Sequence, residues 1–170
     1  MMKAEYLWAM KEFRNDEIEV RVILEDKAYS CLEEIVNSSG CFETGGILIG
    51  YYDVSCQNAI ITEITNAPKD SKSGGNWFSR GISGLKQLLI HRWKAKEEYY
   101  LGEWHLHPKS FPKPSSVDVS QMKQISKDKR YNCKEPLLLI VGENKRKLEI
   151  NLMLIMNDKI YEFKKNNLQL

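Results

Sequence analysis

The sequence predicts one α/β domain built on a mixed β-sheet. Short runs of apolar and β-branched residues recur along the chain, and amphipathic helical patterns separate some of them. Other runs follow one another across short turns, as strands in hairpins do. The 170 residues suffice for one domain with an ordinary core, and no linker or repeat divides them. This mixed order of helices and hairpins is typical of an α/β fold.

The first part of the chain predicts an arm, a strand and a helix. Residues 1–16 carry apolar residues at partly helical spacing, so we expect a short N-terminal helix or arm that packs on the body. Residues 17–24 alternate between charged and apolar, which predicts a half-buried strand that opens the domain of residues 17–163. Asp26 is the expected N-cap of a helix that runs to Asn37.

The middle of the chain predicts the centre of the sheet. Residues 44–52 are apolar at consecutive positions and predict a strand buried on both faces, with residues 59–65 as its antiparallel partner. Residues 66–75 are rich in Pro, Lys, Asp, Ser and Gly and predict a surface loop. A short strand at residues 76–79 and an amphipathic helix over 82–98 should follow.

The last third predicts a central strand at residues 99–107 and, after a proline-containing loop, a helix over 116–127. Strands are expected at 136–141 and 148–156, with a turn at 142–144 between them. A short strand at 159–163 should end the domain, and residues 164–170 should form a polar C-terminal tail.

Composition excludes several classes of protein. The formal charge of +2 is too close to balance to indicate a nucleic-acid partner. No run approaches the roughly 18 apolar residues that a membrane span needs, and no signal peptide is visible, so we expect a cytoplasmic protein with no membrane partner. The four cysteines form no C-x-x-C pair and predict free thiols, not a disulfide framework or a cysteine-type zinc site.

Two histidines and an aspartate predict a metal site. His105 and His107 lie two residues apart on a predicted strand, so both side chains project from the same face, while Trp104 and Leu106 should point into the core. Asp118, in the first turn of the next helix, would supply a third ligand. This ligand set suits zinc, and three protein ligands leave one position for water, as in catalytic zinc sites. The pKa of such a water falls toward about 7.

Glu43 and Ser115 are the candidate catalytic residues. Glu43 could take the proton from the water and pass it to a leaving amine, and the nearby Gly45 and Gly46 would allow backbone or substrate to come close. Ser115 could donate a hydrogen bond to the oxyanion that forms during attack on a carbonyl. An alternative remains open, because Ser115 and Asp118 also have the spacing of a helix N-cap with an acid at N3, which would compete for the Asp118 side chain.

These residues together resemble the JAMM signature of the MPN (JAB/Mov34/PAD-1) metalloproteases. Seven residues separate His107 from Ser115, two separate Ser115 from Asp118, and Glu43 lies far upstream. The resemblance extends over residues 17–156 and implies an MPN (JAB) domain, a mixed central sheet flanked by helices with a cytidine-deaminase-like architecture. It implies one zinc per chain, held by the two histidines and Asp118, with Glu43 as general acid/base and Ser115 supporting the tetrahedral intermediate. Leu106 departs from the Ser or Thr that is usual in eukaryotic members.

The activity that this resemblance implies is zinc-dependent isopeptidase or peptidase cleavage after the C-terminus of a ubiquitin-like protein or another conjugated protein. A compact single domain with Gly-Glu-Trp-His before the second histidine, as in this chain, resembles bacterial JAB proteins. Those proteins accompany E1- and E2-like enzymes, including the enzymes of antiphage operons. The conjugated protein could be a ubiquitin-like modifier or a cyclic-nucleotide synthase joined through its own C-terminus. A non-catalytic MPN scaffold that binds such partners is the alternative, favoured only if the ligand set were broken.

The substrate groove is predicted beside the metal. An extended tail is most easily held as an added strand at a sheet edge, and we expect Trp77 and Phe78 to form one wall of the groove. The alternative, that these aromatic residues fill the core, is equally open. A nucleobase deaminase would need H-x-E with a downstream P-C-x-x-C, and a helical zincin would need H-E-x-x-H; the chain has none of these motifs.

Overall fold

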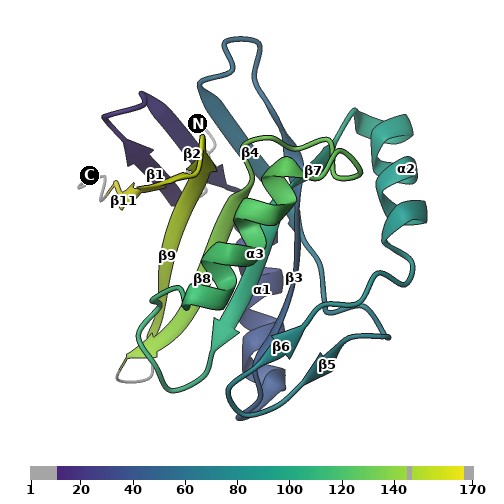
Figure 1. Cartoon of the computed structure of the whole chain (residues 1–170), viewed down its shortest axis with the longest axis vertical. Helices are drawn as coiled ribbons and strands as arrows, with labels where there is room; N and C mark the ends of the chain where they lie inside the picture. The colour runs from purple at the N-terminus through teal and green to yellow at the C-terminus, as the bar shows by residue number, and fades with distance from the viewer. Residues whose placement is uncertain (1–10, 145–146, 167–170) are drawn as a thin grey trace, which may run out of the picture.

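A nine-stranded mixed sheet is the centre of the protein (Figure 1), and the computed structural model describes residues 11–144 and 147–166. Its order is β10-β9-β8-β7-β3-β4-β2-β1-β11. The pairs β2/β4 and β7/β8 are parallel and the others antiparallel. The strands are β1 (Lys11–Asn15), β2 (Val20–Leu24), β3 (Thr44–Tyr52), β4 (Asn58–Ile64), β7 (Tyr99–His107), β8 (Leu137–Asn144), β9 (Lys147–Met156), β10 (Lys159–Glu162) and β11 (Lys164–Lys165).

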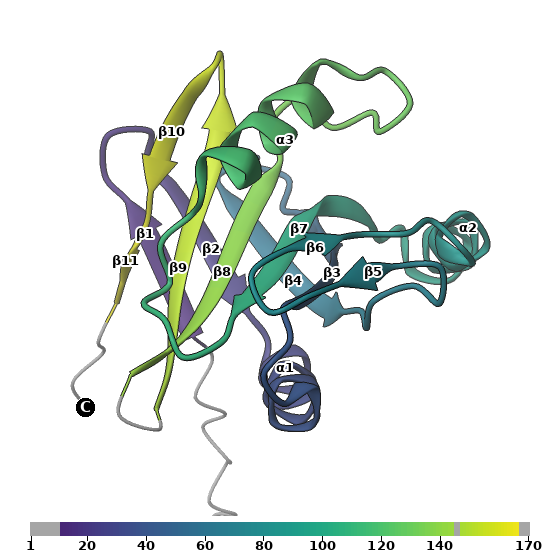
Figure 2. The same cartoon turned by 60° about the horizontal axis from the view of Figure 1, so that its bottom comes forward.

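Helices cover both faces of this sheet. Figure 2 shows α1 (Asp26–Ser39) on one side and α3 (Ser116–Lys127) on the other. Ala28, Leu32 and Ile35 of α1 join one buried cluster, and Met122 and Ile125 of α3 join a second. The third helix, α2 (Leu85–Lys96), lies beside the second cluster but has no fully buried residue. None of the helices in the described ranges is long and apolar enough to span a membrane.

The ends of the chain contain strands where a short helix or arm (residues 1–16) and a polar tail (residues 164–170) were predicted. Residues 11–15 form β1, in which Phe13 is 1% exposed, and residues 164–165 form β11, which pairs with β1. Residues 1–10 lie outside the described part. β11 follows β10 after the single residue Phe163, so one short segment supplies both outer strands of the sheet.

Most of the predicted elements are confirmed. Strands 44–52 and 99–107 and helix 116–127 have the predicted bounds. Other details were wrong. β2 begins at Val20 instead of residue 17, β6 covers only 78–79 of the predicted 76–79, and α2 begins at Leu85 instead of residue 82. In addition, α1 is capped at Glu25 instead of Asp26, and residues 142–144 continue β8 instead of forming a turn. The predicted surface loop contains β5 (Lys72–Ser73), which pairs with β6 (Phe78–Ser79) as a separate hairpin.

An irregularity in β7 decides which of its side chains face α3. Ile49 of β3 pairs with Tyr100, but the next pair is Leu48 with Gly102, so Leu101 is an extra residue. Such a bulge re-aims the side chains that follow it. Tyr100 therefore shares a face with Glu103 three residues later, as their hydrogen bond shows. Alternation then continues along the strand to the two histidines.

Phe13→Ala should test the observation that β1 belongs to the core. We expect the free energy of unfolding to fall by about 3–5 kcal/mol, because truncation of a buried Phe loses apolar burial and leaves a cavity. Urea denaturation followed by circular dichroism measures this change. The control is Phe111→Ala, whose side chain is 60% exposed and should change stability by less than about 0.5 kcal/mol. Equal effects of the two substitutions would contradict the placement of β1.

Candidate metal centre

The candidate site is a pocket of about 430 Å³ where β7 ends. The structure brings all seven residues predicted for the site into its lining, although they come from four separate segments of the chain. These residues are Glu43, Trp77, Phe78, His105, His107, Ser115 and Asp118. The geometry thus joins the predicted metal ligands, the predicted catalytic residues and the predicted groove wall in one cavity.

His105, His107 and Asp118 converge as a possible metal-binding group. One ligand atom from each lies within 4.8 Å of the others. His105 Nδ1 is 2.7 Å from Asp118 Oδ1, and His107 Nε2 is 3.3 Å from Asp118 Oδ2. Two imidazole nitrogens and one carboxylate oxygen are a set of donors that fits zinc and leaves a coordination position for water. The three side chains are therefore consistent with a metal site.

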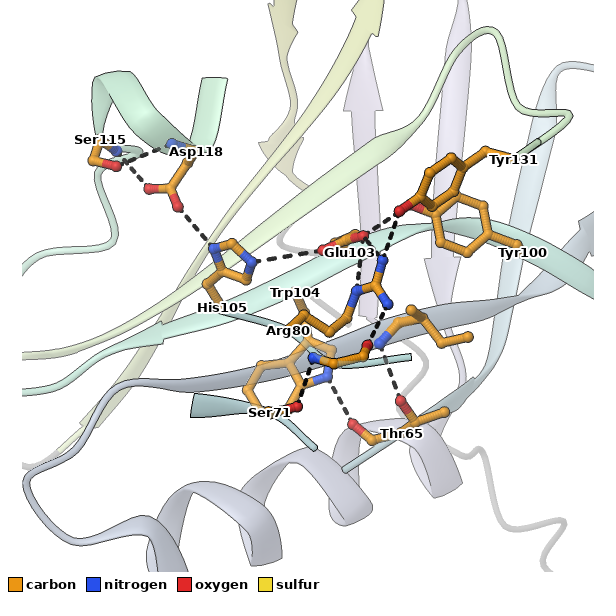
Figure 3. Close-up of polar contacts among 12 residues, drawn as sticks. Thr65, Ser71, Arg80, Tyr100, Glu103, Trp104, His105, Ser115, Asp118 and Tyr131 are labelled. Carbon is orange, nitrogen blue, oxygen red and sulfur yellow. Dashed lines mark hydrogen bonds and ion pairs between the residues drawn. The ribbon is translucent and has the colours of Figure 1, made fainter. Parts of the chain in front are cut away.

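Asp118 serves both the helix and the cluster, so the competition considered from its spacing does not arise. Its Oδ2 accepts a hydrogen bond from the Ser115 backbone N–H at 2.7 Å, while the Ser115 hydroxyl oxygen accepts one from the Asp118 N–H at 3.1 Å. This is a complete capping box. Oδ1 remains directed at His105 (Figure 3). Oδ1 thus contacts His105, while Oδ2 both accepts the capping hydrogen bond and lies near His107 Nε2.

Charge dominates the acid–base properties of the cluster. Burial lowers the pKa of His105, but contacts with the Asp118 and Glu103 carboxylates raise it to about 9. Burial raises the pKa of Asp118, but the two histidines and the hydrogen bonds from Ser115 hold it far below its ordinary value. These carboxylates therefore favour positive charge at the imidazoles, which either a proton or a metal cation can supply.

Glu43 lies just before β3 at the edge of the pocket and is half-buried. Its backbone N–H donates to Gly74 O at 3.1 Å, which ties this segment to the β5–β6 hairpin. Burial raises the pKa of Glu43, His107 lowers it and Asp118 raises it, and the net shift is upward. A carboxylate with a raised pKa beside a metal site is suited to accept and return a proton.

Position 45, at the start of β3, has no room for a side chain. Gly45 pairs with His105 across the β3–β7 ladder. A Cβ on Gly45 would collide with the backbone carbonyl oxygen of Trp104, and it would lie 2.8 Å from His105 Cδ2 and 2.9 Å from Phe78 Cε1. The predicted close approach of backbone is therefore confirmed, and the glycine also leaves room for the candidate ligand His105 and its aromatic neighbour Phe78.

Trp77 and Phe78 do not fill the core, so the alternative interpretation of these aromatic residues was wrong. Trp77 is 51% exposed, and Phe78 is half-buried outside both core clusters. The Phe78 ring meets His105 edge to face, with centroids 5.6 Å apart. By contrast, Trp104 and Leu106 point into the core as predicted, and Trp104 Nε1 donates to Thr65 O at 2.9 Å.

A buried acid–base pair, which was not predicted from the sequence, lies behind His105. Glu103 is fully buried and pairs with Arg80, which follows the β5–β6 hairpin. Arg80 Nη2 also donates to the Tyr131 hydroxyl at 3.0 Å, as Figure 3 shows. Burial raises the pKa of Glu103, but its contacts with His105 and Arg80 bring it below the ordinary value. The sequence contains a pattern that could have identified Glu103. Side chains two residues apart on a strand share a face, and Glu103 lies two residues before His105 in an otherwise apolar strand.

Comparison with known proteins identifies the family. Residues 34–153 match the family model described as prokaryotic homologs of the JAB domain. This match covers more than half of the chain and includes every residue of the candidate site. The chain therefore belongs to the prokaryotic JAB-domain family, and its mixed sheet with flanking helices is an α/β MPN fold.

Bacterial relatives named "CD-NTase/cGAS isopeptidase" share part of this chain. One from Enterobacter hormaechei subsp. hoffmannii is 44% identical over 116 residues, which are 66% of this chain and 64% of that protein. Another from Pseudomonas aeruginosa is 33% identical over 116 residues, or 67% and 71% of the two chains. The chain thus spans less than two thirds of the length of the Enterobacter relative.

A solved structure is similar in fold. The solution structure of a Desulfitobacterium hafniense protein aligns with a TM-score of 0.59 and 20% identity, covering 82% of this chain and 87% of that one. At this level of identity the similarity concerns the fold alone. The chemistry of the site depends on its own side chains.

Asp118→Ala should remove zinc binding, because it deletes one of three ligands. It should also lower the free energy of unfolding by about 0.5–2 kcal/mol, because the capping box loses a member. Metal analysis of the dialysed protein measures zinc content. Asp128→Ala is the matched control at the other end of α3, where Asp128 pairs with Arg130, and it should keep about one zinc per chain. Retention of zinc by Asp118→Ala would remove Asp118 from the ligand set.

Proposed function

We propose that this protein is a zinc-dependent isopeptidase of the JAMM type. It would hydrolyse the bond after the C-terminus of a ubiquitin-like protein or of another protein conjugated by E1- and E2-like enzymes. The observation that supports this most strongly is that Glu43 shares one pocket with His105, His107 and Asp118. A proton acceptor beside an open three-ligand site is the arrangement that metal-assisted hydrolysis requires.

The residues of the pocket divide the reaction among them. When bound, zinc polarises the carbonyl and lowers the pKa of the attacking water. Glu43 accepts the proton of that water and then donates it to the leaving amine, so it acts first as base and then as acid. The Ser115 hydroxyl uses its oxygen as an acceptor in the helix cap, and its own hydrogen remains available to the developing oxyanion.

The β5–β6 hairpin is the proposed wall for the substrate tail. It is a two-stranded sheet separate from the main sheet, and each strand pairs only with the other in the described part of the chain. An extended peptide can add to such an edge through backbone hydrogen bonds. Trp77 and Phe78 also line the pocket and provide apolar contact for the tail. The tail would thereby lie across the site with its scissile carbonyl near His105 and His107.

The names of the relatives support a conjugated protein as substrate. Since those proteins are named isopeptidases of CD-NTase, a nucleotidyltransferase joined through its C-terminus is the first candidate for this chain. A ubiquitin-like modifier is the other. In either case we propose a role in antiviral defence. The protein would act in the cytoplasm of a bacterium, within a system in which E1- and E2-like enzymes attach one protein to another.

Glu43→Gln should abolish cleavage and retain zinc. The amide cannot accept the proton of the attacking water, and general acid–base catalysis contributes about 10²–10⁴-fold to such reactions. The assay incubates the zinc-loaded protein with fusions that extend candidate ubiquitin-like or nucleotidyltransferase C-termini and detects the products by mass. Metal analysis of the same sample reports zinc content.

Glu97→Gln is the matched control for this assay, because Glu97 is exposed at the end of α2 and outside the pocket. It should cleave at the wild-type rate. Full activity of Glu43→Gln would refute the proposed mechanism. If the zinc-loaded wild type cleaved no fusion, the scaffold alternative would gain support.

Trp77→Ala should raise KM for a cleavable fusion while leaving zinc content unchanged. Loss of an aromatic contact of this kind costs about 1–2 kcal/mol of binding, which corresponds to roughly a fivefold to thirtyfold increase. Steady-state kinetics measure the change. Trp93→Ala is the control, because Trp93 is similarly exposed on α2 and does not line the pocket. Equal effects of the two substitutions would argue against the hairpin as the groove wall.

A further inference from the structure

We propose that Glu103 is a positioning residue that makes His105 bind the metal through Nδ1, while His107 binds through Nε2. This inference rests on the metal site of the proposed function, but it does not depend on which bond the enzyme cleaves. Glu103 would act through His105 and would not touch the metal or the substrate. Arg80 would hold Glu103 in place for this role.

The first observation is the orientation of the two imidazoles. His105 Nδ1 is the nitrogen that faces Asp118, at 2.7 Å from Oδ1. His107 presents Nε2 to the other oxygen of the same carboxylate, at 3.3 Å. The metal-ligating atoms are expected to be those that converge on Asp118. The two histidines would therefore use different nitrogens, although they lie only two residues apart on one strand.

The second observation concerns the other nitrogen of His105. Its Nε2 faces Glu103 Oε2 at 3.8 Å, and both residues are almost fully buried. Within the described residues, Nε2 and Oε2 are the buried side-chain nitrogen and oxygen atoms that have no hydrogen-bond partner. Buried polar groups in native proteins are nearly always paired. Two unpaired atoms that face each other therefore indicate one interaction that forms when the site is loaded.

Metal binding supplies the missing hydrogen bond. A neutral imidazole that binds a cation through Nδ1 carries its proton on Nε2, so that nitrogen becomes a donor. Among the described residues, the carboxylate oxygen that faces this nitrogen is Glu103 Oε2. A movement of about 1 Å would bring the two atoms to the normal length of a hydrogen bond between N–H and a carboxylate, about 2.8 Å. The carboxylate then fixes the tautomer and the orientation of the ring.

The third observation is that Glu103 is held so that one oxygen remains free for this bond. Arg80 donates to Oε1 from Nε at 3.0 Å and from Nη2 at 2.7 Å, and the Tyr100 hydroxyl lies 3.3 Å from the same oxygen. Arg80 is itself held by Gly81 O and the Tyr131 hydroxyl. Figure 3 shows this chain of contacts from Tyr131 to Asp118. All the stronger donors thus use Oε1, and Oε2 is left to His105.

The decisive measurement is the tautomer of each histidine in the zinc-loaded protein. Long-range ¹H–¹⁵N NMR correlation distinguishes a metal-bound nitrogen from a protonated one. We expect His105 to have zinc on Nδ1 and hydrogen on Nε2, and His107 to have zinc on Nε2. Zinc on Nε2 of His105 would overturn the proposal, because that nitrogen could then no longer donate to Glu103.

A pair of double variants tests the role of Glu103 in zinc affinity. Removal of Glu103 alone would strand the buried Arg80 charge and could unfold the protein, so both variants also carry Arg80→Met. In the first variant, Glu103→Gln keeps a side-chain oxygen that can accept a hydrogen bond from His105 Nε2. In the second variant, Glu103→Met has no such oxygen. We expect the Gln form to bind Zn²⁺ about 10- to 100-fold more tightly than the Met form in chelator competition, because outer-shell partners contribute by that factor.

The control removes a different ion pair. Arg92 pairs with Glu63 at a partly exposed position outside the metal pocket, so Arg92→Met with Glu63→Met should leave zinc affinity unchanged. Unfolding in the presence of a chelator shows whether the Gln and Met double variants are equally stable without metal. Equal zinc affinity of those two forms would overturn the proposal. A protein that shows the expected tautomers and affinities but cleaves no conjugate would refute the proposed function alone.

Discussion

The antiparallel pairing of β3 with β7 is the interaction on which the rest of the site depends. It joins Thr44 to Leu106 and Gly45 to His105, and so brings Glu43 to the pocket that the histidines line. The same ladder directs Trp104 and Leu106 into the core, where burial of their apolar surface stabilises the register. A slip of one residue would exchange the histidines with these core residues, so the hydrophobic effect itself maintains the orientation of the candidate ligands.

Around this ladder the protein buries charged side chains in compensating groups. Glu103 is paired with Arg80, and Asp118 is paired with His105, His107 and the cap of α3. A buried charge is tolerated only when a partner and hydrogen bonds replace its hydration. The two groups meet at His105, which contacts one carboxylate with each ring nitrogen. Substitution of either carboxylate should therefore change the contacts and the charge environment of His105.

The hairpin β5–β6, which is the proposed wall of the substrate groove, contacts the same histidine. Phe78 on the hairpin packs against the His105 ring, and Arg80, just after it, holds the carboxylate on the far side of that ring. Glu43 is also tied to the hairpin, through its backbone bond to Gly74. The proposed groove wall, general base and metal ligand are thus parts of one packed unit. Membership of the JAB-domain family accounts for the fold, whereas this packing is what gives the proposed chemistry its geometry.

The sequence alone determined the elements whose signal is local. The consecutive apolar residues of β3, the apolar content of β7 and the cap of α3 predicted those three elements with their observed bounds. The spacing from His105 to Asp118 predicted the cluster that could hold a metal ion. The tertiary structure decided what depends on distant partners. Phe13 lies in a strand and not in a helix, because β1 pairs with strands from both ends of the chain. Glu103 is a buried, directed carboxylate, because Arg80 reaches it from another segment, and the charge of an isolated acid gives no indication of such a partner.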